Sequence, residues 1–90
     1  TAAGDLTEQL SAKIFPNPTG GDITLEFGEP LQARSMLVVS DLYGRTLQQL
    51  SVESGQASQT LSLQDYPAGI YLIRLTNGHN VIWTGKVVKE

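Results

Sequence analysis

A turn held rigid by two prolines, followed at once by alternating apolar and polar residues, constrains the fold of this chain more than any other feature. The turn is Phe15–Gly21, and the alternation is Asp22–Phe27. Prolines fix their own φ and favour an extended preceding residue, whereas glycines let a chain reverse direction. The residues that set this geometry are Pro16, Asn17, Pro18, Gly20 and Gly21. Because a period of two places every second side chain on one face, the segment predicts an entry into a β-sheet.

Turn sequences recur along the rest of the chain at the spacing of roughly 8–12 residues that is typical of sandwiches and barrels. Asp41–Gly44 has aspartate at the first position of a type I turn and glycine at the fourth, which predicts a three-residue hairpin connection closed by a glycine bulge. Pro67 presets the second position of another turn, Tyr66–Gly69. The Asn-Gly pair at 77–78 fits a two-residue type I′ hairpin, unless the loop continues to residue 80.

Between these turns we expect seven short strands from Lys13 onward and no helix. The six with defined limits are Asp22–Phe27, Ser35–Ser40, Arg45–Val52, Gln59–Leu63, Ile70–Thr76 and Val81–Lys89. The side chains expected to face the core are Ile23, Leu25, Phe27, Leu37, Val39, Leu47, Leu61, Leu63, Tyr71, Ile73 and Leu75. The glutamines beside Leu47 are expected to face water, and Thr84-Gly85 is expected to bend the last strand. The pattern predicts an all-β fold, a seven-stranded antiparallel immunoglobulin-like β-sandwich without the cysteine pair of antibody domains.

Composition excludes several classes of function. The chain has 90 residues, a formal net charge of −3 and six lysines and arginines, so it lacks the basic stripe of a nucleic-acid-binding surface. It has no cysteine, which removes disulfides, thiolate metal sites and cysteine nucleophiles together. No run of about 18 apolar residues is present, so we expect no direct membrane insertion.

No arrangement of residues points to catalysis, so we predict that the chain is not an enzyme. The single histidine, His79, lies in a predicted turn, and no G-x-S-x-G elbow presents a serine nucleophile. Asp22, Glu26 and Asp41 carry the oxygen ligands that calcium prefers, but their spacing is not that of an EF-hand. Asp41 is better explained by its turn. We therefore expect no cofactor and no metal.

Two groups of residues have both a structural and a binding interpretation. The aromatic group consists of Trp83, Tyr43 and Tyr66. These rings could form a platform for sugars or could close the ends of an ordinary sandwich, and two coplanar exposed rings would indicate the platform. The second group is on the last predicted strand, where Lys86 and Lys89 flank two valines. Lysines there would either protect an edge from unwanted pairing or be recognised by another protein.

Four phrases of the sequence carry a resemblance to a known family. The phrases are Phe15–Gly21, Ser40–Arg45, Leu63–Tyr71 and Lys86–Lys89. In order and spacing they resemble the C-terminal sorting domains of the type IX secretion system (Por secretion system) of Bacteroidetes, over Ile14–Lys89. The structural motif residues are Pro16, Asn17, Pro18, Gly20, Asp41, Gly44, Pro67, Gly69 and Tyr71. Phe15 replaces the commoner tyrosine, Tyr66 stands where leucine is usual, and Glu90 follows the final lysine.

This resemblance implies a signal domain that directs a cargo protein across the outer membrane and that a surface sortase commonly removes. The implied partners are the type IX translocon, an outer-membrane shuttle protein and the sortase. The implied location is the periplasm in transit, and then the cell surface or the medium. Residues 1–12 would be a linker from the parent cargo protein and residues 13–90 the sorting domain, so we expect the chain to be a piece of a longer protein.

We hypothesise that the secretion machinery recognises the last two predicted strands, in part by pairing along an exposed strand edge. The residues proposed for this recognition are Arg74, Lys86, Val87, Val88 and Lys89. An open edge would also allow weak homodimerisation. The alternative is a non-catalytic carbohydrate-binding or spacer β-sandwich module of an extracellular enzyme.

Overall fold

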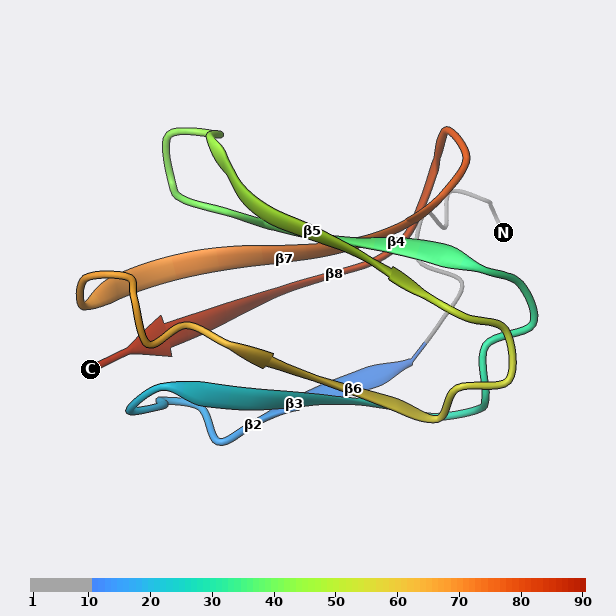
Figure 1. Ribbon diagram of the computed structural model, residues 1–90, viewed down its shortest axis with the longest axis horizontal. Helices are drawn as coiled ribbons and strands as arrows, with labels where there is room; N and C mark the ends of the chain where they lie inside the picture. The colour runs from blue at the N-terminus through green and yellow to red at the C-terminus, as the bar shows by residue number, and fades with distance from the viewer. Residues whose placement is uncertain (1–10) are drawn as a thin grey trace, which may run out of the picture.

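Two antiparallel sheets face each other across a single core in the computed structural model, which describes residues 11–90 (Figure 1). The smaller sheet has the order β2 (Ala12–Phe15), β3 (Asp22–Phe27), β6 (Ser58–Ser62). The larger sheet has the order β5 (Thr46–Val52), β4 (Ser35–Ser40), β7 (Gly69–Asn77), β8 (Asn80–Lys89). The part of the chain that is described contains no helix. The predicted all-β, seven-stranded antiparallel sandwich is confirmed.

The strand order also matches that of immunoglobulin-like domains. In chain order the strands correspond to A, B, C, C′, E, F and G, with A-B-E in one sheet and C′-C-F-G in the other. Tyr71 lies near the start of β7, the F strand, and its hydroxyl donates a hydrogen bond to the Pro67 carbonyl. This is the tyrosine corner of immunoglobulin-like sandwiches, in which a tyrosine fixes the corner between strands E and F.

Alternation along the strands builds the core. The buried apolar side chains are Ile23, Leu25, Phe27, Leu31, Leu37, Val39, Val52, Leu61, Leu63, Tyr71, Ile73, Leu75, Trp83 and Val87. They include every residue predicted to face the core except Leu47, which is half-buried and packs against it. The expectation that both neighbouring glutamines face water is wrong for Gln48. Its amide donates to the Ser62 carbonyl and to the Tyr66 hydroxyl, both at 3.1 Å, because a register shift between β4 and β5 turns it toward the smaller sheet.

The hairpin between β4 and β5 has the predicted turn. The Gly44 N–H donates to the Asp41 carbonyl at 3.2 Å, and Gly44 has a φ of 86°. The register shifts by one residue next to the turn, as a glycine bulge requires. A positive φ of this size favours glycine, since a Cβ would be strained there.

The turn between β7 and β8 differs from the prediction. Asn77 pairs with Asn80, so the two loop residues are Gly78 and His79 rather than the Asn-Gly pair. Gly78 has a φ of 64°, and no non-glycine residue that the structure describes has a positive φ. Glycine in the left-handed region at the first central position alone is the pattern of a type II′ turn, whereas type I′ needs a positive φ at both positions.

The irregularity in β8 also lies elsewhere than predicted. The register shifts at Ile82, between the pairs Leu75–Trp83 and Thr76–Val81, and is unbroken at Thr84-Gly85. Gly85 has a packing role instead, because a Cβ at this position would collide with the Trp83 ring. The indole of Trp83 lies over the backbone of Gly85, which is two residues further along the same strand and has no side chain.

The predicted linker over residues 1–12 falls almost entirely outside the described residues, and Ala12 is already the first residue of β2. Within the described part, Gly20 does not have a positive φ, and a Cβ there would meet no atom within 4 Å. The expected need for glycine at this position therefore has no steric basis. The Phe15-Pro16 and Asn17-Pro18 peptide bonds are both cis.

Candidate recognition surface

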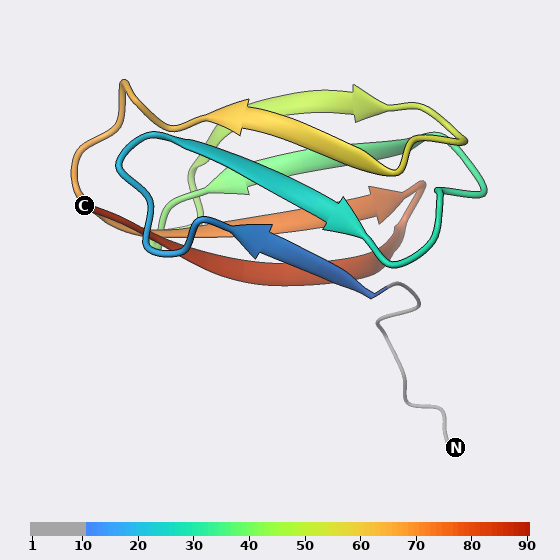
Figure 2. The ribbon, with the colours of Figure 1, turned by 90° about the horizontal axis from the view of Figure 1, so that it is seen from below.

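The four motif phrases meet at one end of the sandwich. The connections β2–β3, β4–β5 and β6–β7 lie at this end together with the end of β8, at the left of Figure 1 beside the C-terminus. The connections β3–β4, β5–β6 and β7–β8 lie at the opposite end (Figure 2). We refer to the first end, formed by residues 16–21, 41–45, 63–69 and 86–90, as the motif end. Antiparallel pairing brings alternate connections to the same end, although the phrases are far apart in the sequence.

Asn17 joins the first phrase to the last. Its Nδ2 donates to the Lys86 carbonyl at 3.1 Å, and its Oδ1 accepts from the Val88 N–H at 3.0 Å. The side-chain amide thus forms the two hydrogen bonds that a neighbouring strand would supply to the edge of β8. Sequence reasoning treated Asn17 only as a residue of the turn and did not foresee this role.

Thr19 completes the connection through its backbone. Its N–H donates to the Val88 carbonyl and its carbonyl accepts from the Glu90 N–H, both at 2.9 Å. Its buried hydroxyl donates to the Asp22 carbonyl at 2.7 Å and accepts from the Gly21 N–H at 3.0 Å, which holds the turn closed. We refer to Asn17 and Thr19, with the backbone of residues 86–90, as the clasp. Sequence reasoning did not single out Thr19.

The clasp occupies the outer edge of β8 at the motif end. β8 is an edge strand of the larger sheet, so this edge would otherwise be open to another strand. Pairing by a partner along residues 86–90 would have to displace the hydrogen bonds of Asn17 and Thr19.

The structure separates the residues that were proposed for recognition. Arg74, Lys86 and Val88 all point outward from the larger sheet, where Arg74 pairs with Thr84 and Lys86 pairs with Leu72. The Val87 side chain is fully buried in the core. Lys89 is half-buried on the opposite side of β8, and its Nζ lies 3.4 Å from the Glu90 carbonyl.

The outer face of the larger sheet is apolar and basic. None of its four strands contains an aspartate or glutamate, whereas β3 of the smaller sheet carries Asp22 and Glu26. The charged side chains of the larger sheet are Arg74, Lys86 and Lys89, in a chain whose net charge is −3. Ile70, Leu72 and Val88 are exposed beside Arg74 and Lys86 on the outer face, whereas Lys89 is on the other side of β8.

The two predicted turns at the motif end enclose an open groove of about 370 Å³, which Leu42, Tyr43, Tyr66, Pro67 and Ile70 help to line. Tyr43 is 88% exposed and Leu42 is 59% exposed, at the tip of their turn. On the other wall the Tyr66 ring leans on Tyr71 with a centroid separation of 5.5 Å. The groove is therefore mainly aromatic and apolar.

Asp41 fixes the first of these turns. Its Oδ1 accepts from the N–H groups of Tyr43 and Arg45 at 2.9 and 3.0 Å, and its Oδ2 accepts from the Arg45 Nε at 2.7 Å. Partial desolvation raises the pKa of Asp41, but the hydrogen bonds from Arg45 and Tyr43 and the charge of Arg45 outweigh it and hold the pKa below its ordinary value. The carboxylate is thus part of the turn and is paired with the exposed guanidinium of Arg45.

A family model described as a secretion system C-terminal sorting domain matches residues 13–90. The chain belongs to this family of sorting domains. The resemblance to type IX secretion domains is confirmed, and the function that follows is that of a sorting signal for export to the cell surface or the medium. Such a family interacts with the type IX secretion machinery and is not a family of catalysts. No curated protein matches the chain.

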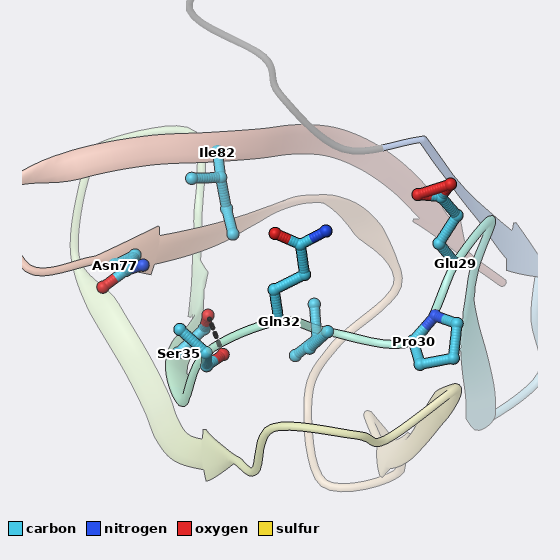
Figure 3. Close-up of a pocket in the computed structure, with 8 residues that line it drawn as sticks. Glu29, Pro30, Gln32, Ser35, Asn77 and Ile82 are labelled. Carbon is cyan, nitrogen blue, oxygen red and sulfur yellow. Dashed lines mark hydrogen bonds between the residues drawn. The ribbon is translucent and has the colours of Figure 1, made fainter.

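The sorting domain also has a hollow of about 230 Å³ at the end opposite the motifs (Figure 3). Its lining includes Glu29, Gln32, Ser35, Asn77 and Ile82. The Ser35 hydroxyl donates to the Ala33 carbonyl at 3.1 Å and has no histidine beside it among the lining residues. Glu29 is the only titratable residue of the lining, so this hollow has no acid–base pair.

The three rings considered for sugar binding do not form a platform. Trp83 lies in the core of the sorting domain, and Tyr66 is half-buried against Tyr71. Only Tyr43 of the three is widely exposed. Within residues 11–90, no group of three metal-binding side chains is found, and no helix is long and apolar enough to span a membrane.

Proposed function

We propose that this sorting domain directs a cargo protein across the outer membrane by the type IX machinery, and that a surface sortase then removes it. The observation that carries the proposal is the motif end, where four separate phrases of the family meet and the clasp joins the first of them to the last. Pre-ordered backbone lowers the entropy cost of docking. The domain would thus be a substrate of the sortase rather than an enzyme.

The proposed route passes through the periplasm to the cell surface or the medium. The partners in it are the translocon, an outer-membrane shuttle protein and the sortase. Residues 1–12 are the proposed linker from the cargo, and the cut would fall within them or before them. A folded domain suits this route, because the machinery can recognise a surface of the signal only while the domain that forms this surface is folded.

Export of a fusion protein tests the sorting function. Residues 1–90 are fused to the C-terminal end of a fluorescent protein that is targeted to the periplasm. The fusion is produced in a bacterium with a type IX system and in the same strain without the translocon. We expect fluorescence at the surface or in the medium only in the competent strain, with a shortened product that locates the cut.

Retention of an intact, folded fusion in the periplasm of both strains would contradict the proposal. The host must first be shown to export a related domain. Retention would favour the alternative, a spacer or carbohydrate-binding module of an extracellular enzyme.

The proposed recognition residues are Arg74, Lys86, Val88 and Lys89, with the buried Val87 supporting the strand that carries three of them. Replacing Lys86 and Lys89 by glutamine should reduce export and leave the melting temperature unchanged, since neither side chain belongs to the core. The matched control is Lys13→Gln on the exposed face of the smaller sheet. Unchanged export of the double variant would remove both lysines from the recognition surface. Weak homodimerisation through an open edge stays a prediction.

A further inference from the structure

Exposed apolar side chains of the sorting domain gather in one place. Seven large apolar side chains are exposed among the described residues, and six of them lie at or beside the motif end. Phe15 is on the smaller sheet, and the other five are Leu42, Tyr43, Ile70, Leu72 and Val88. Leu42, Tyr43 and Ile70 line the groove between the two turns. Ile70 pairs with Val88 across β7 and β8, and Leu72 follows on the same outward face. We refer to these five residues as the apolar band.

The fold does not require apolar residues at the tip of this band. Leu42 and Tyr43 occupy the two central positions of a type I turn, which accept most residue types. The turn itself is fixed by Asp41 and Gly44, through hydrogen bonds that do not involve either side chain. A contiguous exposed apolar patch on a small soluble domain typically marks an interaction site, and aromatic residues are enriched in the centres of such sites.

The charges beside the band define its partner. Arg74 and Lys86 lie on the same outward face as Ile70, Leu72 and Val88. Arg45, beside the groove, forms an ion pair with Asp41, so this pair adds no net charge. The four strands of this sheet contain no carboxylate, so the charged side chains that they place on this face are basic although the chain is acidic. The complementary surface presents apolar side chains with carboxylates around them.

We propose that the apolar band docks such an acidic and apolar surface of a protein in the export machinery. This inference rests on the proposed sorting function and assigns to it a surface that includes the turn residues Leu42 and Tyr43. A protein partner fits better than a lipid surface. Recognition of anionic lipid typically uses a cluster of four to eight basic side chains, and this face carries far fewer.

Variants of the fusion protein test the inference. One variant replaces Leu42 and Tyr43 by serine, and a second replaces Ile70 and Leu72 by threonine, which keeps the preference for strand. We expect each to reduce the exported fraction by roughly tenfold or more, the usual effect of removing central contacts of an interface. Melting temperatures of the purified domains verify that the fold is intact. If the variant at Ile70 and Leu72 proves less stable, the variant at Leu42 and Tyr43 tests the inference alone, since these two side chains are outside the core.

Met36→Thr is the matched control. Met36 is similarly exposed on the outward face of β4, where it pairs with Thr76 near the opposite end of the sheet. We expect wild-type export of this variant. The charge reversals Arg74→Glu and Lys86→Glu together should reduce export as the apolar variants do, because they would repel the carboxylates of the partner.

Three outcomes would overturn the inference. Wild-type export of both apolar variants would refute the proposed docking role of the apolar band and leave the sorting function in place. Binding of the domain to anionic phospholipid vesicles, lost in the same variants while export is unchanged, would assign the band to a lipid surface. Failure of the unaltered fusion to be exported, in a host that exports a related domain, would refute the sorting function and this inference with it.

Discussion

A single side chain, that of Asn17, couples the beginning of the sorting domain to its end. It stands between two prolines and forms hydrogen bonds with the backbone of Lys86 and Val88, 69 and 71 residues further along the chain. Asparagine suits this position because its amide carries both a donor and an acceptor, as a peptide group does. Aspartate would retain the acceptor and place a negative charge against the Lys86 carbonyl.

We predict that Asn17→Ala lowers the free energy of unfolding by about 1–2 kcal/mol, since two solvent-accessible hydrogen bonds are lost. Urea denaturation measures this change. Amide hydrogen exchange should accelerate most at Val88, whose N–H loses its acceptor. Gln49→Ala, on the exposed face of β5, is the control for a general surface effect. Unaltered exchange at Val88 would show that the clasp does not hold β8.

Among the elements, the hairpin of β4 and β5 depends most on local chemistry. Its turn is fixed by one carboxylate, which accepts hydrogen bonds from Tyr43 and Arg45, and by one glycine with a positive φ. The pKa of Asp41 is below its ordinary value, so the folded hairpin favours the ionised form. Stability from this group is present above the ordinary pKa of about 3.9 and is lost as the pH falls through the lower pKa of the folded state.

Comparison with Asp41→Asn across a pH series isolates this contribution from the other carboxylates. We predict that the wild type is more stable than the variant at neutral pH, and that the difference shrinks as the pH falls below about 4. The measurement is the free energy of unfolding in urea at each pH. A difference that stays constant down to about pH 3 would mean that the charge of Asp41 does not stabilise the turn.

At the scale of the whole molecule, both sheets share one core, so loss of a core side chain affects the entire domain. Leu25, in the central strand of the smaller sheet, is fully buried. Leu25→Ala should cost about 2–5 kcal/mol, a large part of the roughly 5–15 kcal/mol that stabilises a small domain. We therefore expect this variant to lose export through loss of folding. Thr24→Ala is the control, because Thr24 directly precedes Leu25 and its side chain points outward. Normal export of a Leu25→Ala domain that is unfolded when purified would contradict this.

Much of the fold could be predicted because it depends on neighbours in the sequence. The alternation of Asp22–Phe27 sets which side chains of β3 are buried, whatever lies on the other side of the core. The Asp41–Gly44 turn depends on groups within five residues of one another. The same locality made the four phrases recognisable, and with them the family.

The candidate site was predictable only in part. Arg74, Lys86 and Val88 do share a face, because alternate residues of paired strands point to the same side. Val87 is buried for the same reason, since it alternates with them. From the sequence, Leu42 and Tyr43 could be assigned only to the central positions of a turn, with no role in binding. Their exposure beside Ile70 depends on two connections that are distant in the sequence.

By itself, the sequence determined the β-strands, the turn at Asp41–Gly44 and the membership of the sorting-domain family, since each rests on short-range preferences. Only the tertiary structure decided the clasp between Asn17 and β8, the burial of Trp83 and the apolar band at the motif end. Trp83 faces the core because a register shift at Ile82 sets the side to which it points. The order of the strands in the sheets decides which backbone groups lie opposite Asn17 and which charges surround Ile70. Strand order is set by the packing of the whole domain and not by any one segment.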